Sequence, residues 1–322
     1  YQQDKSFNFD PIQLKAMISP SDFQSIVPFL HTFHTTYFLT AQVKGNSNGM
    51  QLSQLTLNNP TGTISLDALG SVKLEDGKLT SGDLAINSLT ASAKGIQDLL
   101  DELQLDEKVK KTVASFGSVA FTGWGTYTRE STILDGRLLT SAGNVNYTAM
   151  IDSVKNISAS VKAQKFNVGA LMQNSNYGVA DLDVNISAKD KKLLSAVGKC
   201  NVSGSALDLQ SDIDYSLNGE NYDLKLNSNI YNFNPYALSL TKDLRGDTYS
   251  GMLDAHVTGS SIDNVKGFVN LQDVRMQNDS VSLSFDGLNV VVDRGEDGTH
   301  MNVESDFLRA DLEGDIYFST LV

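Results

Sequence analysis

The chain has 322 residues, of which 40% are hydrophobic and 20% are charged, so it is expected to fold around a sizeable core and does not belong to the disordered class. Its 38 Asp and Glu residues outnumber 25 Lys and Arg residues, and the formal charge of −13 argues against a nucleic-acid partner because a polyanion would be repelled. The single cysteine, Cys200, excludes an internal disulfide, a paired-cysteine redox motif and a cysteine-based zinc site.

The N-terminal part, residues 1–170, is predicted to begin with a helix and to continue mainly as strands. The motif Ser19-Pro20-Ser21-Asp22 is typical of a helix start and predicts a helix over about 20–30. Apolar residues at helical spacing predict a second helical stretch over 96–116, broken near Asp106. Alternation of apolar and polar residues predicts strands at 38–43, 64–74, 84–89, 119–127 and 145–151.

The C-terminal part, residues 171–322, continues the same alternation. Single helical turns are predicted at 168–172, where the two parts meet, and after Asn234-Pro235. The strands predicted here include 182–186, 222–226, 253–257 and 281–285. We expect both parts to belong to one β-groove.

Six Asn-Gly or Asp-Gly pairs separate these runs, and such pairs favour tight antiparallel hairpins because both residues tolerate positive φ. The pairs are Asn48-Gly49, Asp76-Gly77, Asp135-Gly136, Asn218-Gly219, Asp286-Gly287 and Asp297-Gly298. The predicted fold is therefore mainly all-β: a long, curved antiparallel sheet that forms a groove, with two or three short helices as plugs or caps at its ends.

The predicted helices are too few to cover a whole sheet face. The apolar face must then close on itself as a sandwich or remain as a groove that a ligand fills. The residues expected on this dry face, and hence the candidates for contact with a ligand, are Leu182, Val184, Ile186, Leu224, Leu226, Val281, Leu283 and Phe285.

Motifs for catalysis or metal binding are incomplete. Gly45-Asn46-Ser47-Asn48-Gly49 matches the nucleophile elbow of esterases, but a predicted strand follows Ser47 where that motif needs a helix. His31 and His34 could share a helix face around a metal, yet no third ligand stands at a recognisable spacing. No catalytic residue, metal or cofactor is assigned.

Other polar groups have simpler interpretations. The series Asp181-x-Asp183-x-Asn185 begins like a calcium loop but carries Ile186 where that loop needs glycine, so it is read as the wet face of a strand. The acid pairs Asp212/Asp214 and Glu296/Asp297 could serve a glycosidase only if they converge in space. Cys200 is interpreted as an inert strand residue.

Three stretches resemble one protein family. The run from Val303 to Gly314, VESDFLRADLEG, resembles a recurrent phrase of the TamB branch of the AsmA-like proteins, which are long periplasmic proteins of Gram-negative bacteria. Two further stretches are similar to that branch. These are Ile18 to Phe23 with Phe29-Leu30, and Phe121-Thr122-Gly123 followed by Leu138-Leu139-Thr140 and Gly143.

In that family an inner-membrane anchor precedes a long, folded-over β-sheet with an apolar groove. The resemblance implies a non-catalytic middle segment in the periplasm that binds or conducts phospholipid acyl chains for outer-membrane biogenesis. We expect an excised or processed piece whose parent is anchored in the inner membrane. Membrane contact and outer-membrane assembly partners would then involve parts of the parent absent here.

The alternative is a chaperone-like or structural segment that assists outer-membrane β-proteins through its strand edges. A carbohydrate-active enzyme or esterase on a β scaffold is a third hypothesis. It is disfavoured because no nucleophile, base and orienting group can be assembled from the sequence.

Overall fold

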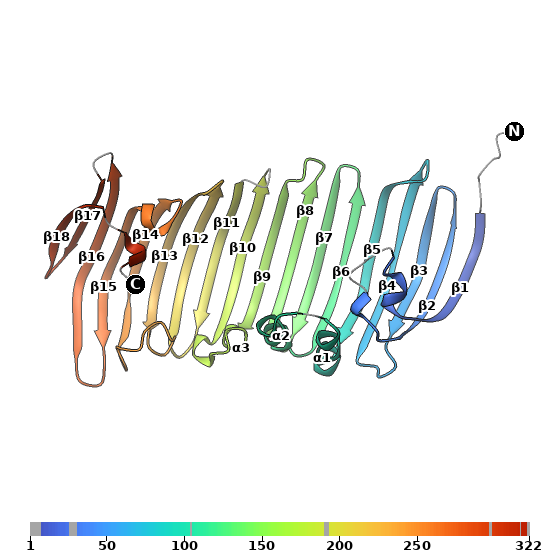
Figure 1. Ribbon diagram of the computed structural model, residues 1–322, viewed down its shortest axis with the longest axis horizontal. Helices are drawn as coiled ribbons and strands as arrows, with labels where there is room; N and C mark the ends of the chain where they lie inside the picture. The colour runs from blue at the N-terminus through green and yellow to red at the C-terminus, as the bar shows by residue number, and fades with distance from the viewer. Residues whose placement is uncertain are drawn as a thin grey trace. The chain divides into compact units, whose positions relative to one another are not determined.

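The computed structural model describes residues 8–25, 31–103, 105–189, 193–295, 298–315 and 317–320. Within them the chain forms eighteen β-strands and three short α-helices (Figure 1). The expected fold class, mainly antiparallel β with a few short helices, is confirmed. The chain divides into two compact units, Tyr1–Val154 and Lys155–Val322, here called unit 1 and unit 2. The expectation that 1–170 and 171–322 belong to one groove stays a prediction.

Unit 1 is a meander in which each strand pairs antiparallel with the next. Helices α1 (Ala93–Glu102) and α2 (Glu107–Ala114) connect its fifth strand to its sixth. Short connections explain this order, because tight turns can join only antiparallel neighbours. The strands are β1 Asn8–Ile18, β2 Tyr37–Asn46, β3 Gly49–Asn58, β4 Ile64–Glu75, β5 Lys78–Ala91, β6 Val119–Thr128, β7 Ser131–Thr140 and β8 Gly143–Asp152.

Unit 2 is a second antiparallel meander, of ten strands. Helix α3 (Val168–Leu171) follows its first strand, at the single turn predicted for 168–172. Three 3-10 turns, η3 Ser175–Tyr177, η4 Ile262–Asn264 and η5 Phe318–Thr320, lie in its connections and near its end. The strands are β9 Ile157–Asn167, β10 Val179–Lys189, β11 Leu193–Ser203, β12 Leu207–Asn218, β13 Asn221–Phe233, β14 Thr248–Gly259, β15 Lys266–Gln277, β16 Ser282–Gly295, β17 Gly298–Ser305 and β18 Arg309–Gly314.

The predicted helices differ from the structure in length. The helix expected over 20–30 is a single 3-10 turn, η1 (Pro20–Phe23), which carries the expected capping box of Ser19 and Asp22. Residues 26–30 lie outside the described part of the chain. The stretch over 96–116 is two helices, as predicted, and Asp106 separates them because its carboxylate accepts the Lys108 amide at the start of α2.

Three of the six predicted hairpin pairs lie at or beside a two-residue turn. Asp76 and Gly77 have φ of 51° and 73° between β4 and β5, the mirror-image turn that fits strand twist. Asn48 lies in the turn before Gly49, the first residue of β3, and Gly219 lies in the turn after Asn218, the last residue of β12. Gly298 begins β17, and Asp297 lies outside the described residues.

Two of these predictions were wrong, because Asp135-Gly136 lies inside β7 and Asp286-Gly287 inside β16. At Gly136 the reason is packing. A Cβ there would lie 2.9 Å from Cε2 of Phe121 and 2.9 Å from the hydroxyl oxygen of Tyr147. Glycine is therefore needed for the close approach of two aromatic rings, and not for a turn.

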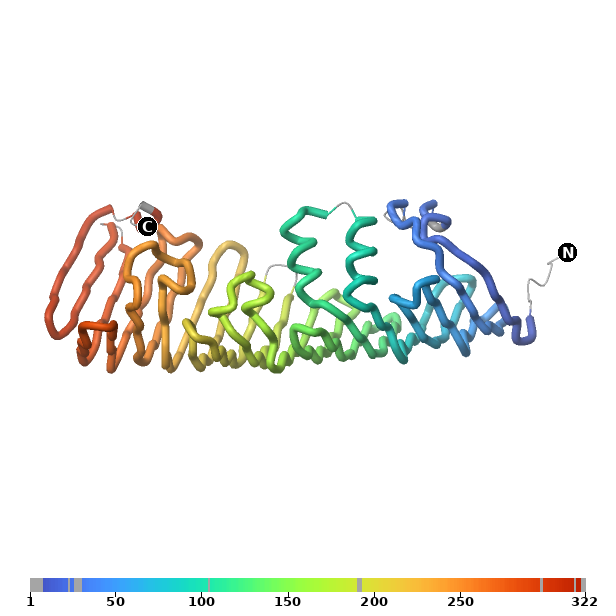
Figure 2. Tube along the Cα trace, turned by 90° about the horizontal axis from the view of Figure 1, so that it is seen from below, coloured from blue at the N-terminus to red at the C-terminus, as the bar shows by residue number. Residues whose placement is uncertain are grey.

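A small buried core of unit 1 lies where α1 meets the ends of the strands. Tyr37, Ile64 and Ala91 are buried there, and Ile96 and Leu99 of α1 pack against them. Figure 2, which shows the strands of unit 1 edge-on, places α1 and α2 on one side of them. The expected helix plug is thus present at one end of this sheet.

Candidate functional site: the apolar sheet faces

The register of unit 2 gathers apolar residues on one face. Directly paired positions across the middle of all ten strands form a row in which every residue is apolar. From β9 to β18 this row is Val161, Val184, Gly198, Ile213, Leu226, Ala255, Val269, Val290, Val303 and Ala310. We call the side of the sheet that carries this row the apolar face of unit 2.

The neighbouring row, displaced by one residue, faces the other way and is entirely polar. Lys162 pairs with Asp183 and Lys199 pairs with Asp212 through ion pairs of 3.0 Å and 3.2 Å, all four side chains being exposed. The complete row is Lys162, Asp183, Lys199, Asp212, Asn227, Asp254, Asn270, Asn289, Glu304 and Arg309. The unit is therefore amphipathic across its whole width.

Seven of the eight predicted dry-face residues lie in strands of this face. Val184 and Leu226 belong to the central row, and Leu182, Ile186 and Leu224 lie in the rows beside it. Leu283 and Phe285 lie in β16 and pair with the part of β15 beyond a change of register.

Asp273, with φ of 49°, lies at a bulge in β15, where the register with β14 shifts. Phe285 and Leu283 pair with Val274 and Met276, which lie beyond this bulge. Phe285 is half-buried and meets the ring of Phe307 edge-on at 5.4 Å. Val281 lies just before β16, in the turn where its amide donates to Asn278, and it is not part of the strand alternation.

Unit 1 has an equivalent face. Paired positions from β1 to β8 again form a wholly apolar row: Ala16, Leu39, Leu57, Leu66, Leu89, Phe121, Leu138 and Val145. We call this side the apolar face of unit 1. The sequence prediction of ligand contacts named no residue of this face, although residues 64–74 and 84–89 show the same alternation of apolar and polar residues.

These faces are not closed cores. In the central row of unit 2 only Ala255 is buried, and the other residues are partly exposed. Within each unit, the described strands pair in one series of sequence neighbours. The chain exposes 20315 Å² of surface, whereas two compact units of half its mass of 34.9 kDa would together expose about 16,000 Å².

The polar side chains near the centre of the apolar face of unit 2 are satisfied or neutral. Ser211 and Ser228 are buried and share a hydrogen bond of 2.6 Å across β12 and β13. Cys200 pairs with Leu182 and Ser211 on this face, and burial raises the pKa of its thiol. The central part of the face therefore offers hydrocarbon surface without a charge, whereas the strand alternation places Arg294, near the end of β16, on the same side.

The apolar face of unit 1 contains a hollow of about 370 Å³, here called the glycine hollow. Gly82, Gly123 and Gly125 line it on β5 and β6, together with the side chains of Leu84, Phe121 and Tyr147. The rings of Phe121 and Tyr147 are stacked, with centroids 6.3 Å apart and planes 18° apart. The lining suits an apolar ligand better than a charged one.

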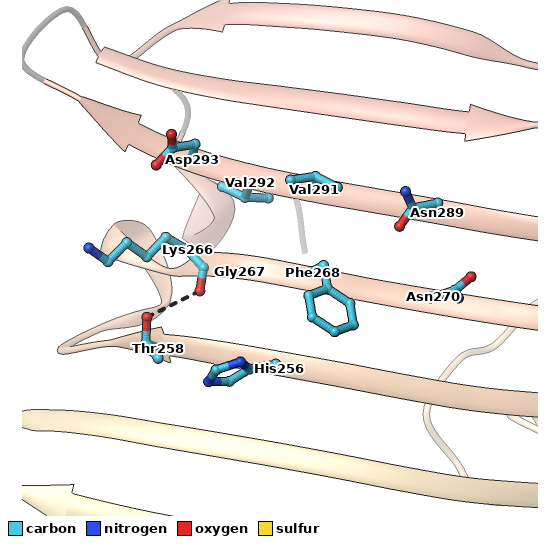
Figure 3. Close-up of a pocket in the computed structure, with 10 residues that line it drawn as sticks. All are labelled: His256, Thr258, Lys266, Gly267, Phe268, Asn270, Asn289, Val291, Val292 and Asp293. Carbon is cyan, nitrogen blue, oxygen red and sulfur yellow. Dashed lines mark hydrogen bonds between the residues drawn. The ribbon is translucent and has the colours of Figure 1, made fainter.

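The polar face of unit 2 has a wide, open depression of about 680 Å³ over β14, β15 and β16 (Figure 3). His256 there lies 3.1 Å from Asp223 and meets the ring of Phe268 edge-on. The hydroxyl of Thr258 donates to the carbonyl of Lys266 (Figure 3). No hydrogen bond joins His256 to a hydroxyl or thiol in the described ranges, so a nucleophile activated by His256 is not assembled there.

The remaining sequence candidates do not converge. Ser47 lies in a two-residue turn between two strands, so the strand-to-helix elbow is not formed. Asp183 pairs with Lys162, and Asp181 accepts the Lys165 amide at 2.6 Å, as expected for the wet side of a strand. Glu296 and Asp297 lie outside the described residues.

The described residues offer neither a metal site nor a membrane-spanning helix. They contain no group of three or more His, Cys, Asp or Glu side chains placed to hold a metal ion, and His31 and His34 belong to none. The described helices include none that is long and apolar enough to cross a membrane.

Comparisons with family models, curated proteins and solved structures found no match to this chain.

Proposed function

We propose that this chain is a non-catalytic module that binds or conducts phospholipid acyl chains along the apolar faces of its sheets. The observation that carries the proposal is the uninterrupted apolar row across all ten strands of unit 2, in which every residue except Ala255 is partly exposed. A monomer seldom exposes a contiguous apolar patch of more than a few hundred Å² unless that patch binds something.

Hydrocarbon chains fit this surface for a physical reason. The row carries no charge and no unsatisfied hydrogen-bonding side chain, so it gains free energy only by removing apolar area from water. An acyl chain provides that area at about 25 cal/mol per Å² without needing a specific partner atom. Because this binding is non-directional, an acyl chain can move from one strand to the next.

The proposal includes the family suggested by the sequence. A segment of an AsmA-like protein of the TamB branch would lie in the periplasm of a Gram-negative bacterium, with its parent anchored in the inner membrane. Phospholipid would be its ligand, and outer-membrane assembly proteins would meet other parts of the parent. The one-sided meanders support this assignment because a lipid groove needs that architecture.

The alternative function is capture of outer-membrane β-proteins at a strand edge. The observation in its favour is that β1 is exposed along most of its length, including Ile12 and Leu14. Against it, Asp10, Pro11 and Lys15 stand on the same strand, and charges and proline are what proteins use to discourage edge pairing. The two functions predict different cargo in the purified protein, phospholipid or peptide.

The test places a charge on the apolar face. Leu226→Arg puts a cation in the central row, at a cost of about 2.5 to 3.5 kcal/mol if the filled groove resembles a bilayer interior. Asn227→Arg is the matched control, because the adjacent residue is exposed on the polar face. Both proteins are examined by circular dichroism, thermal unfolding and mass spectrometry of the extracted lipid.

We expect both variants to fold and only Leu226→Arg to lose phospholipid. A phosphatidylcholine with a photoreactive acyl chain should label the unaltered protein at peptides that contain Val184, Leu226 or Leu283. If no such peptide is labelled and Leu226→Arg abolishes folding, the face is a closed core and the lipid function is abandoned.

A further inference from the structure

The glycine hollow interrupts an otherwise even surface. On the apolar face of unit 1, Gly82 pairs with Tyr127, and Gly125 lies between Leu84 and Leu134. Gly123 lies between Ile86 and Gly136 in the next row. Because a glycine presents no side chain, the face is lowered where these residues gather and bounded by the large side chains beside them. The volume of about 370 Å³ falls within the range of small-molecule sites, roughly 300–1,000 Å³.

Packing shapes the hollow before any ligand enters. A Cβ on Gly123 would lie 2.6 Å from the carbonyl oxygen of Asp135 and 2.8 Å from Cζ of Phe121. The Phe121 ring therefore lies close over the backbone at Gly123 and Gly136 and stacks on Tyr147. A preformed aromatic wall costs little ordering entropy on binding.

The charges near the hollow determine which part of a lipid it could hold. Asp83 and Asp135 belong to the opposite face by strand alternation, and Asp83 accepts a hydrogen bond from Ser71. No cation among the described residues lines the hollow, and both neighbouring charges are carboxylates, which repel a phosphate. The complementary ligand is an uncharged hydrocarbon chain, with its headgroup held away from the site.

We propose that the glycine hollow is a fixed seat for a segment of one acyl chain, held against the Phe121 and Tyr147 rings. This inference rests on the proposed lipid function and adds a preferred resting position to it. Elsewhere on the apolar face of unit 1, protein side chains fill the rows, and an acyl chain would lie on top of those side chains. In the glycine hollow the acyl chain lies between side chains and buries more of its own surface.

Trp124, the single tryptophan of the chain, provides the readout. It lies between Gly123 and Gly125 on β6, so alternation places its indole on the opposite face of the sheet. Only the backbone of the sheet separates the indole from the hollow. Phosphatidylcholine with brominated acyl chains quenches tryptophan fluorescence only at short range. We expect this probe to quench Trp124 in the unaltered protein, and the same lipid without bromine to leave the fluorescence unquenched.

Gly125→Leu fills the hollow with least damage to the sheet. Its backbone is not in the left-handed region, and an added Cβ would approach only Cδ2 of Leu134, at 2.9 Å, and the carbonyl oxygen of Ile133, at 3.4 Å. The Leu134 side chain can move aside. Thr126→Leu is the matched control, because it adds the same side chain to the opposite face at the next residue.

The expected result is loss of quenching in Gly125→Leu and its retention in Thr126→Leu, with the total amount of bound lipid nearly unchanged in both. Leu84→Gln serves as a second variant should Gly125→Leu fail to fold, because Leu84 is 48% exposed and its replacement leaves the backbone alone. Leu84→Gln should weaken the quenching of Trp124, because it replaces an apolar side chain that lines the hollow with a polar one.

The outcomes separate the two proposals. Quenching that persists in both Gly125→Leu and Leu84→Gln overturns the seat, because lipid would then reach Trp124 from the outer face. Bound lipid without any quenching in the unaltered protein also overturns the seat and leaves the lipid function standing. Absence of bound lipid in the unaltered protein overturns the lipid function itself.

Discussion

The alkylation rate of Cys200 measures how accessible the apolar face of unit 2 is to solvent. Its thiol lies beside Leu182 and Ser211, and burial raises its pKa. Alkylation requires the thiolate, so we expect iodoacetamide to react much more slowly at pH 7 with the folded protein than with the chain unfolded in urea. The rate should rise with pH beyond the range in which an ordinary cysteine is already ionised.

Bound lipid should slow the reaction of Cys200 further, since acyl chains would cover the thiol. Mass spectrometry of the alkylated protein, with and without added phospholipid, measures both effects. A folded protein that reacts as fast as the unfolded chain would contradict the placement of this residue on the apolar face.

The contact between Asp263 in η4 and Ser319 in η5 is expected to depend on pH. Its carboxylate accepts the Ser319 amide and the Ser319 hydroxyl, each at 2.8 Å, and these hydrogen bonds lower its pKa, the amide contributing most. Because the folded pKa lies below the unfolded one, the contact stabilises the folded state above the unfolded pKa. That stabilisation is lost as the pH falls through the folded pKa.

The expected consequence is release of the turn η5 from η4 under acidic conditions. Hydrogen exchange of the segment around Ser319, corrected for intrinsic rates, should show protection at neutral pH that disappears in acid. Asp263→Asn should remove this pH dependence. If the variant shows the same acid transition as the unaltered protein, another group is responsible.

At the scale of elements, helix α1 is the part of unit 1 most dependent on burial. Ser92 caps it by accepting the Gly95 amide, and Leu100 is 4% exposed. Leu100→Ala should lower the free energy of unfolding by about 2 to 5 kcal/mol, because it removes buried methyl groups and leaves a cavity.

The control for this prediction is Val109→Ala on α2, where the side chain is 46% exposed and the change should stay within about 0.5 kcal/mol. Urea unfolding followed by the fluorescence of Trp124, which lies in the same unit, measures both variants. Equal effects of the two substitutions would show that α1 does not close the end of the sheet.

At the scale of the whole molecule, the large exposed surface has a thermodynamic consequence. The heat-capacity change of unfolding follows the apolar area that unfolding exposes, and compact proteins give about 12–15 cal/mol/K per residue, or roughly 4 to 5 kcal/mol/K for this length. Because the chain already exposes 20315 Å² when folded, we expect a clearly smaller value by scanning calorimetry. Added phospholipid should bring the value closer to the usual range, and a lipid-free value already within it would mean that the apolar faces are covered.

The sequence by itself determined the strands and their amphipathic character. Strand alternation depends only on the order of residues along the chain, so Leu182, Val184, Ile186, Leu224 and Leu226 could be assigned to one face without knowing their neighbours. Local hydrogen bonding likewise determined the break at Asp106 and the turn at Asp76-Gly77.

Only the tertiary structure decided which strands lie side by side and what each glycine is for. Gly136 resembles a turn residue in sequence, yet the rings of Phe121 and Tyr147, brought to it from other strands, make it a packing residue. The bulge at Asp273, opposite β14, changes the face of Val274, which is the partner of Phe285 on β16. Whether an apolar face is covered depends on contacts between residues far apart in the chain, and strand alternation is the same in a closed sandwich and in an open groove.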